Sequence, residues 1–61
     1  MSREQPTKVW DVVTVEGDKT ILQRGDGRQA TVKTEWLAVT GGTAKATSWR
    51  TEMHVENADW K

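Results

Sequence analysis

Two glycine-containing turns constrain this chain more than any other feature. Gly17-Asp18 separates two runs rich in β-branched residues, and Gly25-Asp26-Gly27 follows the second run. A glycine that opens a two-residue loop favours a primed hairpin turn, because that position needs a positive φ. The first turn then places Glu16 opposite Lys19, a favourable pair of charges on neighbouring strands. Residues 13–37 are therefore expected to form three short antiparallel strands followed by a compact turn.

The length of the second loop follows from the strand register. A three-residue loop with Gly27 in the left-handed conformation places Leu22 opposite Ala30 and Thr20 opposite Val32. A two-residue loop would turn the apolar residues of the third strand to the other face, because a one-residue slip moves every side chain across the sheet. The three-residue loop gives one apolar face, which we take as the core. Its expected members are Val9, Val13, Val15, Leu22, Ala30 and Val32.

The flanking segments set the expected domain limits. Residues 1–7 are polar and are expected to form a disordered N-terminal arm. Residues 8–56 are expected to form one domain, whose first strand contains a Val12-Val13 pair that allows a β-bulge. Residues 57–61 are expected to be a tail, unless Trp60 docks back onto the domain.

The second half of the domain is less regular. Residues 34–39 are too few for a full helix and predict a 3₁₀ turn near Trp36. Residues 44–56 alternate near their end and predict a half-buried strand, paired in the same sheet or exchanged with a neighbouring copy; an amphipathic helix is the alternative. The strand phase puts Trp49 inside, and both Trp36 and Trp49 are expected in the core. The inward face of this strand is expected to be Trp49, Thr51, Met53 and Val55.

A family resemblance supports this arrangement. The pattern V-x-V-x-G-D-x-x-x-L-x-x-x-D-G-R-x-x-x-V-x-x-x-x-L over residues 13–37 resembles the Tudor and Src-homology-3-like small β-barrel superfamily. The resemblance implies an all-β fold, a strongly bent antiparallel barrel of about five strands with a 3₁₀ turn near Trp36. Members of that superfamily bind peptides, methylated side chains, nucleic acid or partner domains, and they are rarely enzymes.

Composition excludes several classes of protein. The 61 residues contain no cysteine, so neither a disulfide framework nor a thiolate metal site stabilises the domain. No apolar run approaches the ~20 residues of a membrane span and no signal-peptide pattern is present, so a cytoplasmic protein without membrane contact is expected. The nine basic and nine acidic residues cancel, which removes the global electrostatic argument for nucleic acid.

The leading functional hypothesis is a protein-binding patch. Trp10, Val12 and Ile21 share the face opposite the expected core, and tryptophan near arginines is typical of interface anchors. We therefore expect a non-enzymatic binding module that contacts a protein partner or a second copy of itself through these residues. The alternative is that the C-terminal segment, or a bend of the barrel, simply covers them.

A basic stripe provides a second functional hypothesis, namely nucleic-acid binding. Its side chains would bind phosphates while a nearby tryptophan stacks on bases. The alternative is a solvated face whose charges are balanced by acids. The stripe consists of Arg24, Arg28, Lys33 and Arg50.

Chemistry at the single histidine is a third and weaker hypothesis. As alternate residues of one strand, Glu52, His54 and Glu56 would point the same way and could hold a metal, but such spacing also describes an ordinary polar face. No nucleophile with a base and no phosphate-binding loop is visible. We expect no catalytic residues, no metal and no cofactor.

Overall fold

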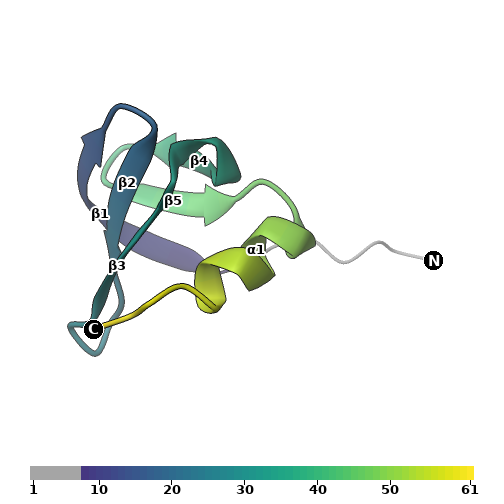
Figure 1. Ribbon diagram of the computed structural model, residues 1–61. Helices are drawn as coiled ribbons and strands as arrows, with labels where there is room; N and C mark the ends of the chain where they lie inside the picture. The colour runs from purple at the N-terminus through teal and green to yellow at the C-terminus, as the bar shows by residue number, and fades with distance from the viewer. Residues whose placement is uncertain (1–7) are drawn as a thin grey trace.

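The structure is a computed structural model that describes residues 8–61, and the expected arm at residues 1–7 lies outside the described residues. Five short strands precede a single C-terminal helix (Figure 1). In chain order the elements are β1 (Val9–Glu16), β2 (Lys19–Gln23), β3 (Gln29–Lys33), the 3₁₀ helix η1 (Thr34–Trp36), β4 (Leu37–Thr40), β5 (Thr43–Ala46) and α1 (Trp49–Glu56).

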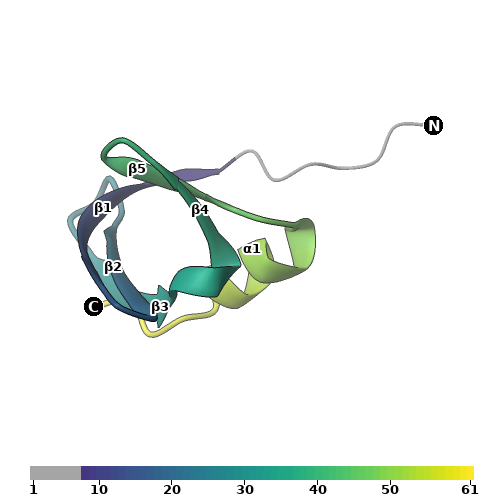
Figure 2. The same cartoon turned by 90° about the horizontal axis from the view of Figure 1, so that it is seen from above.

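The strands form one antiparallel sheet in the order β3-β2-β1-β5-β4. The sheet curls round on itself, with η1 and α1 on the side where it stays open (Figure 2). The edge strands β3 and β4 are not hydrogen-bonded to each other, so the sheet is not closed into a barrel. The five antiparallel strands and the 3₁₀ turn near Trp36 are as expected, whereas barrel closure and the all-β class are corrected to an open sheet with a helix.

The register of the second hairpin is confirmed, and that of the first is confirmed between its turn and a bulge in β1. Glu16 lies opposite Lys19, and Leu22 lies opposite Ala30. Gly27 has a φ of 91° and closes a three-residue loop, in which the Arg24 backbone N–H donates to the carbonyl of Arg28 at 2.8 Å. Glycine is required there because a side chain strongly disfavours positive φ.

The bulge in β1 changes which residues of that strand face the core. The pairing shifts between Val12 and Thr14, so Val12 rather than Val13 lies opposite the fully buried Leu22. Trp10, two residues before Val12, therefore also faces inward and is only 6% exposed. The prediction that Val9, Val13 and Val15 are core residues is wrong, since they are 50%, 47% and 47% exposed, although Val15 does lie opposite the buried Thr20 as predicted. Leu22, Ala30 and Val32 are buried as predicted.

The prediction of a strand over residues 44–56 is right only for its first three residues, where β5 lies. The chain leaves the sheet at Thr47, and Ser48 caps α1. The Thr51 backbone N–H donates to Ser48 Oγ at 3.3 Å and the Ser48 backbone N–H donates to Thr51 Oγ1 at 2.9 Å, a reciprocal capping box. Helical phase then buries Val55 and exposes Trp49 and Met53, so Trp49 is not a core residue. Trp36 is half-buried and packs against the core.

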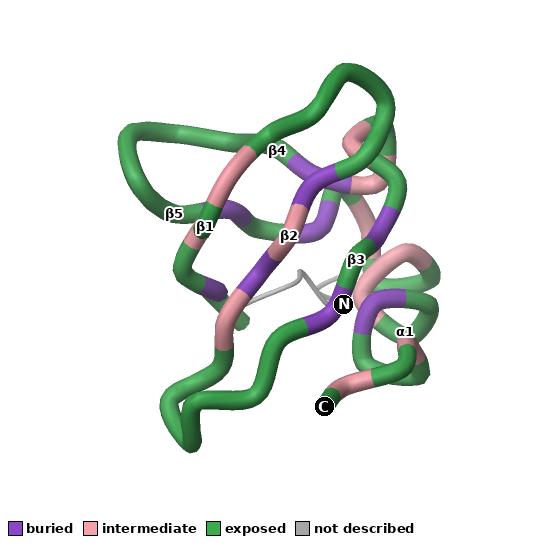
Figure 3. Tube along the Cα trace, turned by 60° about the vertical axis from the view of Figure 1, so that its left-hand side comes forward, coloured by how far each residue is buried: buried purple, intermediate pink, exposed green. Residues whose placement is uncertain are grey.

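The core joins the sheet to the C-terminal segment (Figure 3). Trp60 packs against it, and its Nε1 donates to the Val55 carbonyl at 2.9 Å. Lys61 then exchanges two backbone hydrogen bonds with Gln29 of β3, at 2.8 and 2.9 Å. Residues 57–61 thus return to the edge of the sheet. The buried cluster consists of Trp10, Leu22, Val32, Leu37, Ala44, Ala46 and Val55.

Candidate functional site

The residues expected to form a partner-binding patch do not share an exposed surface. Trp10 lies in the core cluster, and Val12 packs against it from the same face of β1. Ile21 lies on the outer face of β2, opposite Thr14, and is half-buried. Trp10 belongs to the same buried cluster as Val55, so the C-terminal segment helps to cover it. The patch assignment is therefore corrected, because the bulge turns two of its three members inward.

The outer side of α1 carries a different group of apolar side chains. Trp49 and Met53, one helical turn apart, are 46% and 51% exposed. Side chains one turn apart on a helix lie next to each other, so these two form one apolar strip. We call the five residues that line the shallow cavity along this strip the α1 surface. They are Trp49, Arg50, Met53, His54 and Asn57.

Cationic and aromatic groups stack along one side of the strip. The guanidinium carbon of Arg50 lies 5.6 Å from the ring centroid of Trp49. One turn after Arg50, on the same side, the His54 ring stacks on Trp36, with centroids 5.2 Å apart and planes 24° apart. Lys33 Nζ lies 5.8 Å from the same Trp36 ring. These stacked side chains therefore extend from the α1 surface across η1 to the end of β3.

The acidic residues of α1 lie along the other side of the strip and do not line the cavity. Glu56 forms an ion pair with Lys8, and Glu52 accepts a hydrogen bond from the Lys8 backbone N–H at 3.3 Å. No carboxylate lines the α1 surface. The predicted strand face that placed both glutamates beside His54 is wrong, because the segment is helical and its residues follow a period of 3.6. Residues 8–61 contain no group of three potential metal ligands.

The predicted basic stripe is divided between two parts of the molecule. Arg24 and Arg28 flank the β2–β3 loop, where Arg24 lies 5.4 Å from the Trp60 centroid and Arg28 Nε lies 3.7 Å from an Asp26 carboxylate oxygen. Lys33 is at the opposite end of β3, about 16 Å away along the strand. Only Lys33 and Arg50 border the same surface, through Trp36 and His54.

A short sequence signal could have located the α1 surface. Ser48 followed three residues later by Thr51 is a variant of the capping-box pattern, and Trp49 with Met53 has the i, i+4 spacing of a helix face. The alternation of residues 49–55 matched the strand period equally well.

Comparisons with known proteins give no relationship to add to this geometry. No family model matches the chain, and neither the curated proteins nor the solved structures contain a match. Within residues 8–61, α1 has neither the length nor the apolar character of a membrane-crossing helix.

Proposed function

We propose that this chain is a non-enzymatic binding module that holds an acidic, partly apolar segment of a partner protein on the α1 surface. The observation that carries the proposal is the pair Trp49 and Met53, each about half exposed, on a helix whose other side is anchored by the fully buried Val55. Tryptophan, methionine and arginine are enriched in protein interfaces, and tryptophan and arginine dominate binding energy. A rigid helix face needs little ordering on binding.

Charge complementarity favours a different protein over a second copy of this chain. Arg50 and Lys33 lie on the cavity side of the apolar strip, while Glu52 and Glu56, on its other side, contact Lys8. In an antiparallel two-fold pairing of α1, the cationic side of one helix would face the same side of the other, so cations would face cations. An acidic partner meets these groups with opposite charge.

The same features support a protein ligand over nucleic acid. Two of the four residues of the predicted basic stripe lie at the far end of β3, and Arg28 is already beside Asp26. Binding to a phosphate backbone gains its energy from the release of many counterions, and the few neighbouring cations of this neutral chain would release only a few.

The proposed relationship to Tudor and Src-homology-3-like proteins is supported by the curled five-stranded sheet and the 3₁₀ helix after the central hairpins.

A peptide titration tests the proposal. The probe is a synthetic amphipathic helical peptide with leucine on one face and glutamate on the other, followed by NMR of the four tryptophan indole N–H groups. We expect the Trp49 signal to move first and the Trp36 signal next, while the buried Trp10 stays in place. Trp49→Ala should weaken binding by about tenfold or more, the usual effect of removing an interface anchor. Val39→Ala on β4, where the exposed fraction is 40%, is the matched control and should leave binding unchanged.

Three results would overturn this function. The first is an unmoved Trp49 signal at millimolar peptide, and the second is equal weakening by the control variant. The third is tighter binding of a short oligothymidine, with steep loss in salt. Sedimentation that shows a dimer dissociating in the Trp49→Ala variant would assign the surface to a second copy instead.

A further inference from the structure

The edge of the sheet at β3 has open hydrogen-bonding positions. In an antiparallel pair, residues alternate between those bonded to the neighbouring strand and those whose N–H and C=O point away from it. Gln29 belongs to the second group, because its N–H and C=O bond outward to Lys61. Thr31 and Lys33 follow at intervals of two residues, so both groups of Thr31 and the N–H of Lys33 point outward as well, while the Lys33 carbonyl, at the N-cap of η1, accepts the first hydrogen bond of that helix. Within residues 8–61, no hydrogen bond fills the outward positions of Thr31.

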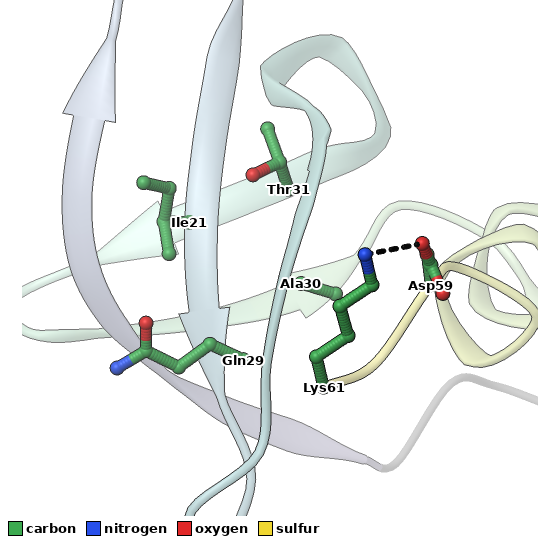
Figure 4. Close-up of a pocket in the computed structure, with 6 residues that line it drawn as sticks. All are labelled: Ile21, Gln29, Ala30, Thr31, Asp59 and Lys61. Carbon is green, nitrogen blue, oxygen red and sulfur yellow. Dashed lines mark ion pairs between the residues drawn. The ribbon is translucent and has the colours of Figure 1, made fainter.

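The C-terminal segment leaves this edge after one residue pair. Lys61 and Gln29 exchange both backbone hydrogen bonds, which is the pattern of an antiparallel strand. A regular strand would continue with residue 59 opposite Thr31, but residues 57–60 form the turn that docks Trp60. The space beside Thr31 is therefore an open cavity (Figure 4). Asp59 borders it and pairs with Lys61 at 3.3 Å.

A second cavity continues along the same edge. It lies beside Thr31 and extends to Lys33 and Trp36. Because both cavities share Thr31, they form one groove that follows β3 from Lys61 to Trp36. This groove has an aromatic side chain at one end and unpaired backbone groups at Thr31 and at the N–H of Lys33.

The cross-strand row beside the groove ends in two lysines, and Asp18 and Glu35 border a cavity with Lys33 without forming an ion pair with it. Glu16, Lys19 and Lys33 lie opposite one another across β1, β2 and β3. The acid of β1 balances one lysine, while Lys33 faces another cation and forms no ion pair within the described residues. Like charges directly opposite are unfavourable, and an acidic side chain on the next strand would complete the row. The neighbouring row contains Thr14, Ile21 and Thr31, and it favours a β-branched residue.

We propose that the β3 edge from Thr31 to Lys33 binds an extended segment of a partner protein as an added strand. The segment places an acidic residue opposite Lys33 and a β-branched residue opposite Thr31, and it turns an apolar side chain toward Trp36. Main-chain hydrogen bonds give such strand addition its affinity and alternate side chains give its specificity. The edge and the α1 surface meet at Lys33 and Trp36, but this interaction requires neither Trp49 nor Met53.

A second copy does not fit the edge in the same way. Symmetric antiparallel pairing about Thr31 would place Lys33 of one chain opposite Gln29 of the other. The outward groups of Gln29 already bond to Lys61, so that register lacks the hydrogen bonds of both Lys33–Gln29 pairs. Symmetric pairing about Val32 would instead place Thr31 of one chain opposite Lys33 of the other, which leaves Lys33 without an acidic partner. The open part of the β3 edge, from Thr31 to Lys33, is long enough for a short extended peptide.

The test uses a capped synthetic peptide of alternating glutamate, valine and threonine, with backbone amide NMR and amide exchange as the readout. We expect the Thr31 and Lys33 amides to shift and to exchange more slowly with the peptide present. The same peptide, N-methylated at the positions that face β3, should cause neither change. Trp49→Ala should leave this binding unaltered, which separates it from the function proposed for α1.

Protein variants complete the test. Thr31→Pro removes only the outward N–H and is tolerated at sheet edges, so it should abolish binding, whereas Thr31→Val should retain it. Lys33→Glu should weaken binding by about threefold or more, while Lys45→Glu on β5 should not change it. If the Thr31→Pro variant does not fold, the comparison of Lys33→Glu with Lys45→Glu decides the outcome. The proposal fails if the N-methylated peptide binds equally well, if Lys33→Glu has no effect, or if sedimentation shows that the edges pair two copies.

Discussion

At the scale of single residues, Gly27 and Gly25 give a matched test of the β2–β3 loop. Gly27 has a φ of 91°, whereas Gly25 has no positive φ, and an added Cβ would meet no atom within 4 Å at either position. Only backbone conformation therefore separates Gly27→Ala from Gly25→Ala. We expect the first substitution to lower the free energy of unfolding by about 1–2 kcal/mol. The second should leave it unchanged or raise it slightly, because alanine restricts the unfolded chain.

Urea unfolding followed by circular dichroism measures both variants. Equal effects of the two substitutions would show that space or chain entropy, rather than the left-handed conformation of Gly27, controls the loop.

The residues of β1 also show which features of this strand the sequence could predict and which it could not. Turn chemistry predicted Glu16 opposite Lys19 and Leu22 opposite Ala30, because glycine positions and loop lengths determine local register. The Val12-Val13 pair indicated a bulge, and the structure has one. A bulge reverses the faces on one side of it, so the inward direction of Trp10 follows only once the bulge is included. The error in the partner patch comes from this single inserted residue.

At the scale of elements, the capping box of α1 gives a second prediction. Ser48 Oγ accepts from the Thr51 backbone N–H, which otherwise lacks a partner within the helix. Ser48→Ala should lower the free energy of unfolding by about 1 kcal/mol. Ser48→Asp keeps an oxygen acceptor at the cap and a negative charge at the helix N-terminus, so it should match the parent protein.

Thermal unfolding and amide exchange in α1 measure this effect. Equal loss in both Ser48 variants would mean that the hydroxyl geometry of Ser48, including its contact with Thr51 Oγ1, matters more than the cap acceptor.

The same element explains why the α1 surface could not be derived from periodicity. In residues 49–55, apolar or small side chains alternate with polar ones, which satisfies a strand, while Trp49 and Met53 also satisfy a helix. Intrinsic preference differs too little between these states to decide. The decision depends on the cap and on the tertiary contact of Val55 with the core, which only the folded chain reveals.

At the scale of the whole molecule, stability depends on a small core without disulfides. A single core of this size supplies only about 3–5 kcal/mol of net stability. Trp10 is 6% exposed in the cluster that joins the sheet to Val55 of α1. Removing a buried tryptophan side chain destabilises a protein by about 3–5 kcal/mol, which equals that total. We therefore expect Trp10→Ala to unfold the whole domain at room temperature.

Val13→Ala is the control variant for this prediction. Val13 is 47% exposed at the bulge, so its truncation should change the free energy of unfolding by less than about 0.5 kcal/mol. Far-UV circular dichroism and the dispersion of backbone amide signals report both variants without relying on tryptophan fluorescence. A folded Trp10→Ala protein, or an unfolded Val13→Ala protein, would restore the opposite assignment of faces in β1. Trp10 would then be a surface residue, and an exposed tryptophan would no longer distinguish the α1 surface from the face that carries Trp10.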